Sequence, residues 1–165
     1  MKNRINAGTM RRILNLWPPF LCTGIRVTEI ASDWRSARVE LRSWPWNRNY
    51  VGVHFGGSLF SMTDPFWMLL AMHALGSGYI VWDQAGTIEF LKPGRGTVHA
   101  GFKLDDAVLD QLREATAGGA RHLQWFETDV VDASGDVVAR VRKQVYVRRK
   151  RVRSEAGSIA EGATP

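Results

Sequence analysis

Residues 49–66 of this 165-residue chain read NYVGVHFGGSLFSMTDPF, and they lead into the segment that decides the fold. Residues 55–75 are apolar on nearly every side and end before a Gly-Ser-Gly sequence. A helix that is hydrophobic all round must be buried all round. We therefore predict a long, buried central helix that begins near Gly57, or at Pro65 if Asp64 serves only as its cap.

The flanking segments alternate between apolar and polar residues, as strands with one buried face do. The clearest case is Ala37, Val39 and Leu41, which face one way while charged and hydroxyl side chains face the other. Gly86 interrupts one long segment and is a candidate β-bulge. The six expected strands are 25–28, 36–42, 79–91, 97–104, 121–131 and 136–147.

Two shorter helices are also expected. The first follows Thr9 as its cap and ends at the Pro-Pro of 18–19, and the second follows Asp105 and ends at the Gly-Gly of 118–119. Two strands precede the central helix and four follow it, without regular βαβ alternation. We therefore predict an α+β fold in which a curved antiparallel sheet wraps around the central helix. The inward positions of the shorter helices are Met10, Ile13, Leu14 and Trp17, then Val108, Leu109, Leu112 and Ala115.

The formal net charge of +6 is concentrated at the two ends of the chain. Residues 1–12 carry +4 and residues 148–165 carry +3, whereas residues 13–147 carry −1. A nucleic-acid-binding domain is expected to carry its basic stripe on the fold itself, so we expect no nucleic-acid partner. We expect one domain over 1–153 and a flexible tail over 154–165, where Gly, Ala, Ser and Glu dominate.

Cys22 is the sole cysteine, which excludes an internal disulfide and a cysteine-rich zinc site and favours a reducing compartment. His73, His99 and His122 show no ligand spacing, so we expect no metal. The longest apolar stretch, 59–75, is too short and too polar to span a bilayer, and no signal-peptide core is recognisable. The sequence therefore predicts a cytoplasmic protein.

Asp64 is the one formally charged residue among the 34 that separate Arg48 from Asp83. An ionisable carboxyl in such an apolar setting needs specific partners or titrates unusually, so it is a candidate for chemistry. The helix would then start near Gly57, and Pro65 would bend it beside the carboxylate. The alternative is that Asp64 caps a helix whose first residue is Pro65.

Asn49 and Gly52 precede the pattern GGxLFSxxD at 56–64. This arrangement resembles the hotdog-fold acyl-CoA thioesterases of the phenylacetate-pathway (PaaI-like) type, and looks closest to an uncharacterised branch of them. Their pattern is Asn-x-x-Gly, then His-Gly-Gly, then an Asp seven residues after the second Gly. The resemblance implies a hotdog fold and the hydrolysis of a coenzyme A thioester to free acid and coenzyme A.

The resemblance also implies roles for individual residues. Asp64 would be the general base for water or the direct nucleophile, Asn49 would orient the water or the carbonyl, and the N–H of Gly57 would stabilise the oxyanion. The site would lie between two subunits of a homodimer or homotetramer, with no cofactor beyond the coenzyme A of the substrate. The candidate substrate-binding residues are Gly52, His54, Phe55, Gly56, Leu59, Ser61, Met62, Phe66 and Met68, whose apolar members would serve equally well as plain core.

One position departs from the family pattern. Phe55 stands where the family has its His, and His54 is displaced by one residue, so it is more readily a hydrogen-bonded loop histidine. The departure favours an alternative, a non-catalytic hotdog protein that binds acyl-CoA or acyl carrier protein. A hotdog dehydratase or hydratase is disfavoured, because Leu69 stands where such a site would have its His, five residues after the Asp.

Overall fold

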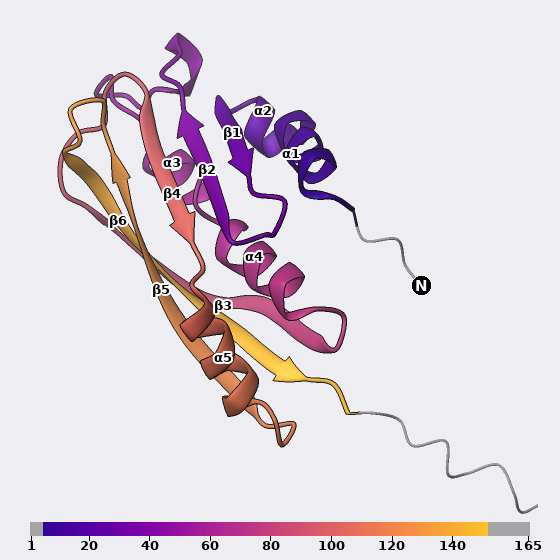
Figure 1. Cartoon of the computed structure of the whole chain (residues 1–165). Helices are drawn as coiled ribbons and strands as arrows, with labels where there is room; N and C mark the ends of the chain where they lie inside the picture. The colour runs from indigo at the N-terminus through magenta and orange to yellow at the C-terminus, as the bar shows by residue number, and fades with distance from the viewer. Residues whose placement is uncertain (1–4, 152–165) are drawn as a thin grey trace, which may run out of the picture.

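The computed structural model describes residues 5–151, and a six-stranded antiparallel sheet curves around a helical layer in it (Figure 1). The strand order is β1-β2-β4-β5-β6-β3, so β1 and β3 are the edges of the described sheet. The predicted α+β class and curved sheet around a central helix are confirmed, and the predicted tail, 154–165, lies outside the described residues. The strands are β1 (Ile25–Ile30), β2 (Ser36–Leu41), β3 (Tyr79–Phe90), β4 (Val98–Lys103), β5 (Arg121–Val131) and β6 (Val137–Arg149).

Side-chain alternation accounts for the short strands β1, β2 and β4. Ala37, Val39 and Leu41 are buried as predicted, and Val39 pairs with Ala100 of β4, which is buried on the same face. The loop after β2 contains a short 3₁₀ helix, η1 (Pro45–Asn47). The face that these strands bury is the one on which the central helix packs.

The central helix consists of two pieces, α3 (Gly56–Ser61) and α4 (Phe66–Leu75), separated by a turn around Asp64. Pro65 causes the break, because it has no N–H to donate to the carbonyl of Ser61. That carbonyl instead accepts from the N–H of Asp64 at 3.2 Å. The sequence predicts a helix start near Gly57 or at Pro65, and each lies one residue from an observed start: α3 begins at Gly56 and α4 at Phe66. The Asp64 side chain makes no capping hydrogen bond to either described piece, so its interpretation as a cap is wrong.

The sheet covers one side of α4. Phe66 stacks on Phe102 with ring centroids 4.7 Å apart, and Trp67 stacks on Phe126 at 4.5 Å. The opposite side, which includes Leu69, is half exposed. The prediction that this helix is buried all round is therefore wrong for the single chain, because a single curved sheet encloses one side of it.

Two short helices, α1 (Ala7–Leu16) and α2 (Pro18–Leu21), pack beside the edge strand β1 (Figure 1). The cap of α1 is Asn6, whose Oδ1 accepts from the N–H of Thr9 at 2.8 Å, and not Thr9 as predicted. The helix starts three residues earlier than expected, so Thr9 lies inside its first turn and its N–H serves as the donor. None of the described helices is long and apolar enough to cross a lipid bilayer.

The predicted inward positions of α1 are only partly correct. Leu14 is buried and Met10 half-buried, whereas Ile13 and Trp17 are 47% and 45% exposed. The reason is that β1 contacts one side of α1, and Ile13 and Trp17 lie beyond that side.

Helix α5 (Asp106–Ala115) connects β4 to β5, and its inward leucines are buried as predicted. Ala115 is exposed, against prediction, because Thr116 takes the inward position after it. Asp105 occupies the cap position, but within the described structure its carboxylate makes no capping hydrogen bond and instead pairs with Lys103 at 3.1 Å.

The register of β3 against β6 shifts just after Asp83, so the bulge is at Gln84 and not at Gly86 as predicted. Gly86 lies in register opposite Lys143. A Cβ at Gly86 would lie 2.8 Å from Cζ of Phe60 and 3.0 Å from Cδ of Lys143. The glycine therefore makes room for two side chains that approach the strand closely.

Candidate functional site

The turn between α3 and α4 brings Asp64 to the surface. Its side chain is 55% exposed, and its Oδ1 lies 2.5 Å from Nζ of Lys143 in β6, 79 positions later in the chain. The other carboxylate oxygen, Oδ2, has no hydrogen-bond partner among the described residues. Asp64 therefore directs one oxygen to a lysine and leaves the other available.

Lys143 is buried, which is unusual for a lysine. Its side chain is 6% exposed, and its Nζ also reaches Oδ2 of Asp83 at 3.2 Å and lies 5.2 Å from the centroid of the Phe60 ring. Oδ1 of Asp83 is buried without a hydrogen-bond partner in the described part of the chain. We refer to these side chains as the Asp64–Lys143–Asp83 cluster.

Burial and charge act in opposite directions within this cluster. Burial raises the pKa of Asp83, and the ammonium group of Lys143 reverses part of that shift. Burial alone would lower the pKa of Lys143, but the hydrogen bond to Asp64 and the charges of both carboxylates outweigh it, so the pKa of Lys143 is raised. The lysine is therefore held as a cation between two carboxyl groups.

Sequence reasoning missed Lys143 and Asp83 as candidates. For Lys143 a signal was present: it shares the inward phase of β6 with Val141 and Val145, both buried. A lysine at an inward-facing, otherwise apolar strand position needs a counter-charge beside it. For Asp83 the pairing depends on the bulge at Gln84, whose position the sequence does not reveal.

A second set of predicted residues lies at the start of α3. Asn49, His54, Gly56 and Leu59 line a pocket of about 410 Å³, whose other wall is the segment 90–94. Within the described chain Asp64 lies outside this lining, beyond the far end of α3. Within a single chain, Asp64 therefore lies apart from the pocket that Asn49 and Gly56 line.

Asn49 organises the loop that forms one wall of the pocket. Its Oδ1 accepts from the N–H groups of Val51 and Val53 at 3.1 and 3.2 Å, and its Nδ2 donates to the carbonyl of His54 at 3.4 Å. Gly52 has a φ of 77° in the same turn, a backbone conformation that favours glycine. One Nδ2 hydrogen of Asn49 remains for a ligand.

His54 is 2% exposed and forms a hydrogen bond at 2.7 Å between its Nε2 and the carbonyl of Gly96. Because a carbonyl only accepts, Nε2 carries the proton, and Nδ1 is a buried acceptor with no described partner. Burial lowers the pKa of His54, the bond to Gly96 raises it, and the charge of Arg48 lowers it further; the net shift is downward. His54 is thus a neutral loop histidine at the pocket wall.

The two glycines that start α3 are covered by aromatic rings. A Cβ at Gly56 would lie 2.7 Å from Cζ of Phe90, and a Cβ at Gly57 would collide with the ring of Phe55. The N–H groups at a helix start have no partner within the helix, so neither amide donates a hydrogen bond inside α3. Phe55 itself is 58% exposed and immediately precedes them.

The remaining predicted substrate-binding residues divide between core and surface. Met62 is completely buried and Phe66 is 1% exposed, so both belong to the core of the single chain. Ser61 and Met68 are half-buried. Among residues 5–151, no group of three His, Cys, Asp or Glu side chains is placed to hold a metal ion.

The curved antiparallel sheet and the central helix define the chain as a hotdog-fold protein. The family model described as "Domain of unknown function (DUF4442)" matches residues 7–147, and the chain belongs to this family. A comparison with curated proteins finds no match by sequence.

Solved structures share the fold at low sequence identity. A Pseudomonas aeruginosa protein of unknown function, described as a "Probable Thioesterase", superposes with a TM-score of 0.75 at 20% identity, covering 85% of this chain and 93% of its own. A thioesterase from Haemophilus influenzae superposes with 0.65 at 15% identity over 90% and 94% of the two chains. The PaaI protein of the E. coli phenylacetic acid degradation operon superposes with 0.56 at 17% identity over 86% and 91%.

Proposed function

We propose that the protein hydrolyses a coenzyme A thioester to a free acid and coenzyme A, with Asp64 as the reacting carboxylate. The observation that carries this proposal is the Asp64–Lys143–Asp83 cluster, in which a buried cation holds one oxygen of a surface carboxylate and leaves the other oxygen unpaired. Two of the three structural neighbours described above are called thioesterases, one of them with the qualifier "Probable".

Lys143 is proposed to position Asp64 for the reaction. The ion pair fixes the orientation of the carboxylate, which both proposed roles of Asp64 require. As a general base, Oδ2 would take a proton from the attacking water, and as a nucleophile it would attack the thioester carbonyl. Asp83 would in turn hold Lys143, because it supplies the second negative charge at 3.2 Å.

The complete site is proposed to form between two copies of the chain. Asp64 and the pocket beside Gly56 lie at opposite ends of α3, which fits a site in which each copy supplies one half. The edge strand β3 pairs on one side with β6 and presents its other side unpaired within the described chain. Such an edge is a ready template for pairing with a second copy.

In the assembled site, the pocket would receive the acyl group, and the N–H groups of Gly56 and Gly57 would donate to the thioester oxygen. Donors placed where negative charge develops stabilise the transition state of acyl transfer. Leu59 and Phe90 give the pocket apolar walls. Coenzyme A enters as part of the substrate, and the proposed reaction uses no other cofactor.

A second candidate function is the binding of acyl-CoA or acyl carrier protein without hydrolysis. The observation that favours it is Phe55, whose ring covers Gly57 where the resembling enzymes have a histidine next to the glycines. A ring in this position would hinder the approach of a carbonyl oxygen to the amide of Gly57.

One experiment separates the two functions. Release of free thiol is measured with a panel of aliphatic and aromatic acyl-CoAs, and binding of a non-hydrolysable thioether analogue is measured by calorimetry. Hydrolysis is supported by thiol release above the uncatalysed rate that Asp64→Asn removes. Analogue binding without thiol release from any acyl-CoA would establish the binding function instead.

A further inference from the structure

Helix α1 has two apolar faces, and the protein covers one of them. Ile13, Leu16 and Trp17 are spaced i, i+3, i+4 and therefore share the second face, where they are 47%, 71% and 45% exposed. Leu21 of α2, which follows directly, is 52% exposed. We call these four side chains the α1–α2 patch.

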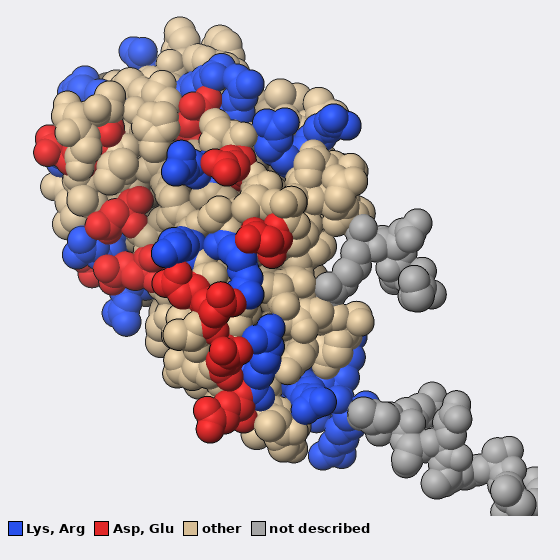
Figure 2. Space-filling model, in the orientation of Figure 1, with Lys and Arg blue, Asp and Glu red and all other residues tan. Residues whose placement is uncertain are grey.

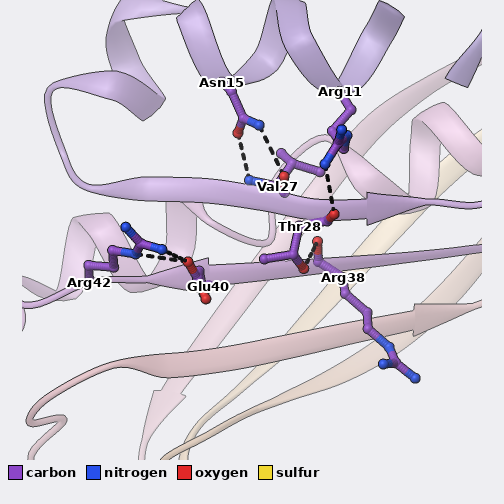
Figure 3. A network of polar contacts seen from close by, with 7 residues as sticks. All are labelled: Arg11, Asn15, Val27, Thr28, Arg38, Glu40 and Arg42. Carbon is purple, nitrogen blue, oxygen red and sulfur yellow. Dashed lines mark hydrogen bonds and ion pairs between the residues drawn. The ribbon is translucent and has the colours of Figure 1, made fainter. Parts of the chain in front are cut away.

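The patch is held in place by hydrogen bonds between α1 and β1 (Figure 3). Oδ1 of Asn15 accepts from the N–H of Val27 at 2.7 Å, and Nδ2 of Asn15 donates to the carbonyl of Val27 at 3.0 Å. Arg11 donates to the carbonyl of Thr28 at 3.1 Å. Because these bonds fix the rotation of α1 on β1, the patch cannot turn inward, and its exposure is a property of the folded chain.

The surface around the patch is positively charged. Among the described residues 5–28, Arg11, Arg12 and Arg26 are basic and none is acidic. Arg12 is exposed and lies four residues before Leu16, so it flanks the patch on the same helix. In Figure 2 the surface over α1 and α2 shows blue and tan atoms, in agreement with this composition.

The neighbouring strands β1 and β2 add one arginine without a described ion pair. A recess of about 300 Å³ beside α2 is lined by Leu21, Arg26 and Arg42. Arg42 is paired with Glu40 at 2.7 Å, whereas Arg26 is exposed and has no described ion pair. The recess therefore offers a free guanidinium group next to an exposed leucine.

We propose that the α1–α2 patch docks onto the surface of a lipid bilayer that carries anionic headgroups. Leucine and tryptophan side chains flanked by arginines are the composition that binds at a bilayer interface, with apolar groups in the acyl boundary and cations at the headgroups. The charge selects this occupant, because two copies meeting through the patch would bring arginines together without an acidic partner from residues 5–28. The patch also lies at the β1 edge, opposite β3. The inference is independent of the proposed hydrolysis.

The test is flotation of the full chain with two kinds of vesicle, one of phosphatidylcholine alone and one of equimolar phosphatidylcholine and phosphatidylglycerol. We expect binding to the anionic vesicles and a decline of that binding with added salt. Leu16→Asp should lower the partition coefficient by about tenfold or more. Arg12→Gln should lower it by about fivefold, since one cation near an anionic surface is lost. Both side chains are exposed, so both variants are expected to fold.

The control is Leu91→Asp, which changes a leucine that is 53% exposed, against 71% for Leu16, just after the opposite edge strand. It should bind vesicles as the unmodified chain does. The proposal is overturned if neither vesicle binds the protein, or if Leu16→Asp and Leu91→Asp weaken binding equally. It is also overturned if Leu16→Asp leaves vesicle binding unchanged and lowers the oligomer mass in light scattering, because the patch would then join copies of the chain.

Discussion

Asp64 is the residue on which the proposed hydrolysis depends. Asp64→Asn keeps the shape of the side chain but removes the base or nucleophile, so we expect kcat to fall by roughly 10²–10⁴-fold. The protein should stay folded, because an amide costs less to bury than an ion. The matched control is Asp110→Asn, which alters an exposed, ion-paired aspartate on α5 and should leave kcat unchanged. Equal turnover of both variants would remove Asp64 from the mechanism.

Lys143 connects stability to the same site. Lys143→Met should lower the free energy of unfolding by roughly 3 kcal/mol, because it leaves Asp83 buried without a counter-charge. The double variant Lys143→Met, Asp83→Asn should recover most of this loss, since the uncompensated charge is gone. Urea unfolding monitored by circular dichroism measures both. If the double variant is no more stable than Lys143→Met, the two residues are not energetically coupled.

His54 gives the stability a pH dependence whose sign is set by its lowered pKa. The pKa of the unfolded chain is near the ordinary 6.5, and that of the folded chain lies below it. The stabilisation from neutral His54 is therefore complete above pH 6.5 and is lost as the pH falls through the folded-state value. His54→Gln should remove this part of the pH dependence in thermal melts. The assignment is contradicted if His54→Gln and the unmodified chain show the same difference in melting temperature between pH 7 and mildly acidic buffer.

At the scale of the elements, two strand glycines form a natural comparison. Gly86→Ala should destabilise the protein by about 1–3 kcal/mol, because the new Cβ would contact Phe60 and Lys143 too closely. Gly101 of β4 has nothing within 4 Å of the corresponding Cβ position, so Gly101→Ala should be neutral or slightly stabilising. Chemical denaturation of the two variants measures the difference. If Gly86→Ala and Gly101→Ala are equally stable, β3 accommodates a Cβ at Gly86 without loss of stability.

The elements also show which features a sequence reveals and which it hides. The inward phases of β2 and β4 follow from alternation alone, because each strand has one buried face. The break before Phe66 follows from the chemistry of Pro65. The bulge at Gln84 does not, because it depends on how Asp83 and Gly86 pack against residues far along the chain. The Asp64–Lys143 pair was missed for the same reason, since 79 positions separate its members.

For the whole molecule, the half-exposed side of α4 and the free side of β3 point to self-association. We expect light scattering at micromolar concentration to give a mass of at least twice the 18.5 kDa of the chain. The reason is that a second copy would cover apolar surface that the single sheet leaves open. A stable particle of 18.5 kDa would contradict both this expectation and the proposed shared site.

The position of β3 has a consequence for the order in which the chain can assemble during synthesis. Its partner in the sheet is β6, as in the pairs Tyr79–Arg149 and Phe90–Ala139. While the ribosome is still translating β5, β6 has not yet been made, so β3 lacks its partner strand. Pairings between segments so distant form late, and unpaired strands are prone to aggregation until then. The ion pair of Asp64 is subject to the same delay, because Lys143 is among the last residues of the sheet to be made.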